Sequence, residues 1–136
     1  MSLIFRLFKP ATSEPREISK GQIWEYETRK GEESSRLYVL KVEQYGRETV
    51  FHVALDNLHM KNLYATGGVQ TELPHIAVSA QSMAKSITKL CGTLEGLPLT
   101  TEGYLLWKES YAAGEASVYR TPIKKVINQV ESLVKG

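Results

Sequence analysis

Apolar and polar residues alternate with a period of two through the first half of the chain, which is typical of β-strands that bury one face. The alternation predicts strands over residues 22–29, 36–45 and 48–56. The segments between them, residues 30–35 and 46–47, contain the glycine and polar residues of tight connections. Three strands joined by short connections predict an antiparallel meander.

The alternation also assigns side chains to the two faces of each strand. Trp24 and Tyr26 share one face of the first strand. In the third strand Phe51 and Val53 are expected to point inward, with His52 on the opposite face. The second strand is apolar on both faces, which predicts a central position in the sheet.

Residues 57–78 give a less regular pattern. A short apolar stretch around Met60 predicts a fourth strand that ends before Gly67 and Gly68. Residues 73–78 are expected to be extended, because Pro74 disfavours the helical conformation for the residue before it.

From Ser79 onward a period of 3.6 residues predicts three helices. We expect Ser79 to cap the first, which runs to Gly92 and buries Cys91. The second follows residue 100 or 101, with Tyr104 and Trp107 on its apolar stripe. The third begins after residues 121–122, with the threonine as its cap and the proline in its first turn.

These elements define an α+β fold, in which C-terminal helices cover one side of an N-terminal antiparallel meander sheet. A sheet that curls into a small open barrel is a variant that the pattern leaves open. At 136 residues the chain is long enough for one domain, which we assign to residues 21–136. Residues 1–20 are expected to form an amphipathic turn that docks on the core, followed by a polar linker.

Charge and composition exclude several classes of partner. Lys and Arg total 17 and Asp and Glu total 15, and no segment has a strong excess of either sign, so no nucleic-acid partner is expected. No run approaches the ~18 apolar residues of a membrane span. The single cysteine, Cys91, cannot form an intramolecular disulfide, which favours a reducing compartment and hence the cytoplasm.

Two serine–lysine pairs, Ser82 with Lys85 and Ser86 with Lys89, match the S-x-x-K spacing of some acyl-transferases. In those enzymes the lysine must lose its hydration to accept a proton. Here both pairs fall on the polar face of the predicted helix, which we expect to be in contact with water. The companion motifs of that chemistry are absent from the sequence as well, so we assign these pairs no catalytic role.

The three histidines, His52, His59 and His75, do not have the local spacing of metal ligands, so no metal is expected. The glycine motifs that cradle nucleotide phosphates are also missing, and the sequence predicts no cofactor. His75 follows a proline at a rigid junction, where it either lines a pocket or hydrogen-bonds a loop carbonyl.

Residues 29–36 alternate in charge, with Glu32 and Glu33 between basic residues. The simplest interpretation is a solvated hairpin tip with self-paired charges. A docking edge formed with the neighbouring aromatic residues is the alternative.

The segments GQIWEY (21–26), GEESS (31–35), LKVE (40–43), EGY (102–104) and WK (107–108) resemble a group of small, uncharacterised bacterial single-domain proteins. The resemblance covers most of residues 20–120. It implies a bacterial single-domain protein, and no catalytic residue is carried over, because the group has no assigned activity. In that group the position of His75 belongs to a histidine–proline–serine stretch, whereas here Pro74 precedes the histidine. Residues 21–26 also resemble the first strand of the small-barrel endoribonuclease toxins.

The sequence contains no coherent catalytic set, which favours a protein-interaction or ligand-binding domain. Its partner is expected to be another protein, or a second copy of the chain in a homodimer. The alternative is a small hydrolase or ribonuclease-like enzyme with His75 or His52 as general base and Arg29 or Arg36 holding an anionic group. The candidate binding residues are Trp24, Tyr26, Arg29, Glu33, Tyr38, His52 and His75.

Overall fold

The computed structural model describes residues 17–96 and 102–136. The expected N-terminal turn and most of its linker lie outside these residues. None of the helices in the described part of the chain combines the length and the apolar character that a membrane span requires.

The centre of the fold is a five-stranded antiparallel sheet with the strand order β6-β3-β2-β1-β7. Its strands are β1 (Gln22–Tyr26), β2 (Leu37–Tyr45), β3 (Glu48–Leu55), β6 (Leu73–Ser79) and β7 (Ile87–Thr93). The predicted β1–β2–β3 meander is confirmed, and the sheet does not close into a barrel. A separate ribbon pairs β4 (Met60–Lys61) with β5 (Val69–Gln70), around the single turn η1 (Thr66–Gly68).

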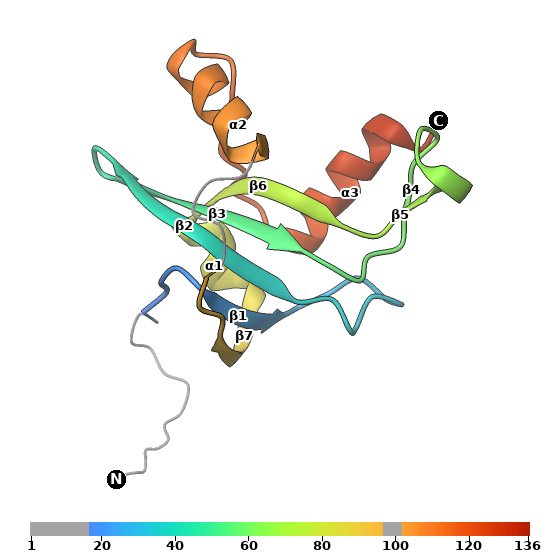
Figure 1. Ribbon diagram of the computed structural model, residues 1–136, viewed down its shortest axis with the longest axis horizontal. Helices are drawn as coiled ribbons and strands as arrows, with labels where there is room; N and C mark the ends of the chain where they lie inside the picture. Colours follow the sequence, from blue (N-terminus) through green and yellow to red (C-terminus); the bar gives the residue numbers. More distant parts are fainter. Residues whose placement is uncertain (1–16, 97–101) are drawn as a thin grey trace, which may run out of the picture.

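Three helices pack on this sheet, as the α+β class predicts: α1 (Ala80–Ser86), α2 (Glu102–Ala112) and α3 (Ile123–Val134). Met83 of α1 and Ile127 of α3 belong to the same buried core as Val39 and Val53. Helix α2 lies on the opposite face, where its Tyr104 ring contacts His52. Figure 1 shows α2 and α1 on opposite sides of strands β2, β3 and β6. The helices are therefore divided between the two faces of the sheet.

The helix that begins after Ser79 is shorter than predicted. Ser79 does cap it, since its hydroxyl accepts a hydrogen bond from the backbone N–H of Ser82 at 3.0 Å. The helix ends at Ser86, however, and the residues predicted to continue it form β7, which pairs antiparallel with β1. The side chain of Cys91 is consequently exposed, and the prediction that it fills the core is wrong.

Ser86, rather than Thr121, satisfies the first backbone N–H group of α3. Its hydroxyl accepts a hydrogen bond from the N–H of Ile123 at 2.9 Å and donates one to the carbonyl of Ser82 at 2.7 Å. Ser82 and Ser86 are both buried, so the expected contact of these serines with water is wrong. Their role is structural: they connect α1 to the start of α3.

A β-bulge in β2 decides which side chains reach the α2 face of the sheet. Val39 pairs with Val53, but the next register pair is Lys41 with His52, which leaves Leu40 as an extra residue. An extra residue exchanges the two faces of the remaining strand. Glu43 therefore lies on the same face as His52.

Candidate functional site

Three side chains from neighbouring strands form a hydrogen-bonded chain on the α2 face of the sheet. The carboxylate oxygen Oε1 of Glu43 on β2 lies 3.0 Å from Nε2 of His52 on β3. Nδ1 of His52 lies 2.9 Å from Nε2 of His75 on β6. The sheet thus brings His52 and His75 together and adds a carboxylate that the sequence did not single out.

Helix α2 covers this chain with aromatic side chains. The rings of Tyr104 and Trp107 meet the ring of His52 edge-on, with centroid distances of 4.8 and 4.9 Å. His52 is 0 % exposed beneath them. The approach of the helix depends on Gly103, because a Cβ atom there would lie 2.8 Å from Cβ of His75.

Glu43 is held by donors on both of its carboxylate oxygens. Tyr45 donates to Oε1 at 2.7 Å, and Tyr104 donates to Oε2 at 2.6 Å. The ammonium group of Lys108 lies 3.4 Å from Oε2. Burial opposes ionisation of Glu43, but the hydrogen bonds from Tyr104, Tyr45 and His52 outweigh it and lower the pKa of Glu43 to about 2. Glu43 is therefore a fixed negative charge at neutral pH.

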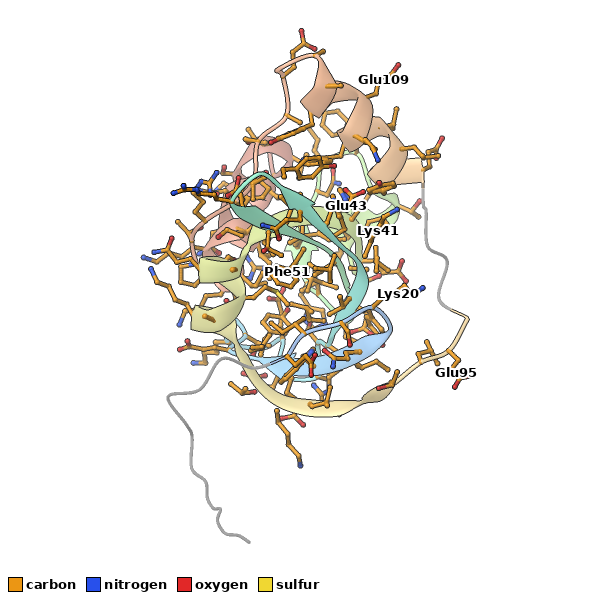
Figure 2. All side chains as sticks on the ribbon, turned by 90° about the vertical axis from the view of Figure 1, so that its left-hand side faces the viewer. Lys20, Lys41, Glu43, Phe51, Glu95 and Glu109 are labelled. Carbon is orange, nitrogen blue, oxygen red and sulfur yellow. The ribbon has the colours of Figure 1, made fainter. Side chains whose placement is uncertain are left out.

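In Figure 2 Glu43 lies with Lys41 on the side of the sheet that α2 covers, and Phe51 points into the interior.

Burial keeps both histidines uncharged at neutral pH. It lowers the pKa of His52, an effect that the hydrogen bond to Glu43 only partly offsets. Burial, together with the neighbouring His52, lowers the pKa of His75 to about 4. In two neutral imidazoles next to a carboxylate, the donor and acceptor roles of one ring fix those of the next. Such a hydrogen-bonded chain can also relay a proton.

His75 is at the end of this chain and lines a cavity of about 320 Å³ between β6, α2 and α3. The indole of Trp107 forms another wall, held by a hydrogen bond from its Nε1 to the carbonyl of Ser117 at 3.1 Å. The remaining lining residues are Leu73, Ile76, Ala77, Ala116, Ser117, Tyr119 and Val130.

The candidate residues in β1 do not take part in this site. Trp24 and Tyr26 belong to the buried core, each 5 % exposed, because they point toward α1 and α3 rather than toward solvent. An exposed aromatic patch that contains Trp24, Tyr26 and His52 is therefore contradicted by their burial. Tyr38 is half-buried and donates a hydrogen bond to Asp56 at 2.7 Å, away from the histidine chain.

The charged hairpin of residues 29–36 is also not the solvated tip that we expected. Glu32 is only 2 % exposed and accepts two hydrogen bonds from Arg29, at 2.6 and 2.8 Å. Arg29 also donates to Glu131 of α3 at 2.9 Å, and Glu32 accepts a hydrogen bond from the backbone N–H of His59 at 2.7 Å. Glu33 is exposed, and its carboxylate accepts a local hydrogen bond from the backbone N–H of Gly31. The hairpin is an anchor between β1, α3 and the segment before β4.

The sequence interpretation missed Glu43, Tyr104 and Lys108 as parts of a site. Tyr104 was assigned to a helix stripe, which its burial confirms, but no spacing linked it to a strand carboxylate. Only the isolated acidic residue within the apolar second strand could have drawn attention to Glu43. Across residues 17–96 and 102–136, no three His, Cys, Asp or Glu side chains are grouped so that they could hold a metal ion.

Comparison of the chain with protein families, with curated proteins and with solved structures finds no match.

The three groups of the chain predict a loss of stability in mild acid. An unfolded histidine binds a proton near its ordinary pKa of 6.5, whereas folded His75 does so only near 4. The unfolded state thus binds more protons below pH 6.5, and the free energy of unfolding falls as the pH falls from 6.5 to 4.5. The slope approaches about 1.4 kcal/mol per pH unit for each proton. Below pH 4.5 the lowered pKa of Glu43 acts in the same direction.

Urea denaturation at pH 4.5, 5.5 and 7.0 measures this effect. The variant His75→Leu removes one of the titrating groups, so its stability is expected to depend less on pH over the same range. A wild-type free energy of unfolding that stays constant between pH 6.5 and 4.5 would contradict the prediction.

Proposed function

We propose that the chain is a ligand-binding domain whose site is the cavity beside His75 and Trp107. The observation that carries the proposal is that a buried chain of polar groups, Glu43–His52–His75, ends at the wall of this cavity. Small-molecule sites are typically concave and mostly apolar, with few fixed polar groups, and they have volumes of ~300–1,000 Å³. The cavity, at about 320 Å³, lies at the lower end of that range.

The walls of the cavity are fixed, as a binding site requires. Trp107 stacks on Tyr111 with a centroid distance of 4.8 Å, and its indole N–H is bonded to Ser117. On the opposite side, the backbone of Tyr119 forms hydrogen bonds with Ala77 and Ser79 along the edge of β6. A ligand therefore meets an arranged aromatic wall and does not have to order it.

A general-base hydrolase is the second candidate, and the histidine chain is the observation that favours it. Only His75 can touch a substrate, because His52 is fully buried. A proton taken up by His75 would place a positive charge in the same hydrogen-bonded network as the carboxylate of Glu43, which can stabilise it. The anion-holding arginine of this hypothesis is not found at the site. Arg29 is engaged with Glu32 and Glu131, and Arg36 donates hydrogen bonds to the carbonyls of Glu33 and Ser35. The pKa of about 4 also makes His75 a weak base at neutral pH.

The compartment belongs to the same proposal. The exposed thiol of Cys91 is unpaired, and a reducing compartment would keep it so. Together with the resemblance of residues 20–120 to a bacterial group, this supports a role in the bacterial cytoplasm.

Filling the cavity is expected to abolish binding. Ala116 lies on the cavity wall in the connection between α2 and α3, and Ala116→Phe places a ring in the space. The matched control is Ala113→Phe, because Ala113 is exposed in the same connection and does not line the cavity. NMR spectra of both variants and of the wild type are recorded with millimolar indole, phenol, benzoate and benzylamine as probes.

We expect at least one probe to shift the Trp107 indole and His75 ring signals in the wild type and in Ala113→Phe. In Ala116→Phe the shifts are expected to fall at least tenfold. If no probe shifts these signals, or if the shifts persist in Ala116→Phe, the cavity is not a ligand site. Catalysis is tested separately, by ester and phosphodiester turnover that His75→Leu abolishes.

A further inference from the structure

Glu43 fixes which atoms donate and which accept in the hydrogen bonds of the site. Its two oxygens receive hydrogen bonds from Tyr45 and Tyr104, with Lys108 close to Oε2. An ionised carboxylate has no proton to donate. The contact between Glu43 and His52 is therefore formed by an N–H group at Nε2 of His52.

This donor decides the state of both imidazoles. A neutral imidazole carries one N–H group and one lone pair. Because Nε2 of His52 holds its proton, Nδ1 of His52 accepts a hydrogen bond, and the donor at 2.9 Å is the N–H group at Nε2 of His75. The lone pair of His75 is thus left on Nδ1.

Nδ1 of His75 is the free end of this chain. It has no hydrogen-bond partner among the described residues. Among those residues, Thr121 Oγ1 is the one buried side-chain polar atom without a partner. Nδ1 is therefore not sealed from solvent; it lies on the side of the ring near Gly103, and the residue lines the cavity. A group that binds there has to be a hydrogen-bond donor.

The lining also excludes a charged ligand. None of the described residues around the cavity is a lysine, arginine, aspartate or glutamate. An ion that entered would lose hydration without gaining a counter-charge. The indole of Trp107 instead favours an aromatic ring.

We propose that the ligand of this cavity is an uncharged aromatic molecule, of the phenol or indole class, that donates a hydrogen bond from its O–H or N–H group to Nδ1 of His75. The inference rests on the proposed binding function and names the ligand class of the same site. In this inference Nδ1 of His75 is the hydrogen-bond acceptor. Glu43 is a positioning residue: through His52 it fixes the ring proton of His75 on Nε2 and so leaves the lone pair on Nδ1.

Pairs of isomers test the donor requirement, because the two members of each pair have the same composition. 4-Methylphenol has an O–H group that its isomer anisole lacks, and 3-methylindole has an N–H group that 1-methylindole lacks. Titrations followed by NMR at pH 7 are expected to give an at least fivefold lower Kd for the donor member, as one hydrogen bond of ~1 kcal/mol supplies. Equal affinities within each pair would overturn the inference.

Nitrogen-15 spectra of the histidine rings test the polarity directly. In the wild type we expect the proton on Nε2 of both His52 and His75. In Glu43→Gln the cations Lys41 and Lys108 keep the amide oxygen near the Oε2 position, so the amide NH₂ faces His52. The ring protons then move to Nδ1, and the preference for donor probes disappears. The matched control is Glu48→Gln. Glu48 lies on the neighbouring strand β3, its carboxylate is bound to Arg120, and the variant is expected to behave as the wild type.

The outcomes separate this inference from the proposed function. If anisole and 4-methylphenol bind equally well, the cavity is a site and the donor requirement is wrong. If no probe binds, the proposed function fails and the ligand class fails with it. A proton on Nδ1 of wild-type His75, or unchanged ring protonation in a folded Glu43→Gln variant, would overturn the polarity argument.

Discussion

Replacement of Arg29 by methionine is expected to lower the free energy of unfolding by about 3–5 kcal/mol. The reason is the carboxylate of Glu32, which is 2 % exposed and is neutralised by two hydrogen bonds from Arg29. Without the guanidinium group a buried negative charge is left with only the backbone N–H of His59. The same change also removes the bond from Arg29 to Glu131, which ties the hairpin to α3.

Urea denaturation of three variants isolates the buried charge as the cause. The double variant Arg29→Met/Glu32→Gln is expected to recover part of the loss, because the unpaired charge is gone. Lys124→Met removes an exposed ion pair with Glu27 and is expected to cost about 0–1 kcal/mol. A loss below about 1 kcal/mol in Arg29→Met would show that the hairpin is solvated after all.

Replacement of Trp24 by alanine is expected to cost about 3–5 kcal/mol, as for other large aromatic side chains removed from a core. Trp24 is 5 % exposed and packs in the same buried cluster as Ile127. Tyr64→Ala is the control, because Tyr64 is 82 % exposed, and it is expected to change stability by no more than about 0.5 kcal/mol.

Chemical denaturation of both variants measures the difference between them. Because Trp24 is a core residue, any binding lost in Trp24→Ala would reflect unfolding rather than a missing contact. Binding is therefore tested with substitutions at His75 and Ala116. A cost below about 1 kcal/mol for Trp24→Ala would place this side chain outside the core.

The parts of the fold that depend on local signals were predicted correctly. The alternation in residues 48–56 gave the inward positions of Phe51 and Val53 and placed His52 on the opposite face. Ser79 starts a helix because its side chain satisfies a free N–H group, which needs no partner outside the segment.

The parts of the fold that depend on residues distant in sequence were not predicted correctly. The spacing of Met83, Ile87 and Cys91 suits a helix, but β1 offers an unpaired edge to the β-branched Ile87 and to the residues that follow it. Pairing with that edge outweighs the helical period. The sequence of β7 contains no sign that this edge is available.

The candidate site was predicted only in its histidines. His52 and His75 meet because β6 pairs with β3, a pairing that no turn signal between them announces. Glu43 reaches His52 through the bulge at Leu40, which shifts the remaining strand by one residue. Without that shift, periodicity places Glu43 on the core face, where a carboxylate has no role.

The strand order has a consequence for how the chain folds. The β2–β3 hairpin closes through the short turn at Gly46 and Arg47, so it forms early from neighbouring residues. Strand β1 pairs with β2 over only a short register and depends on β7, whose Leu90 is far from Trp24 in sequence. Closing so large a loop costs entropy before the contacts reward it. We therefore expect the β1–β7 pair to form late, after the rate-limiting step, so that changes in β7 alter the unfolding rate more than the folding rate.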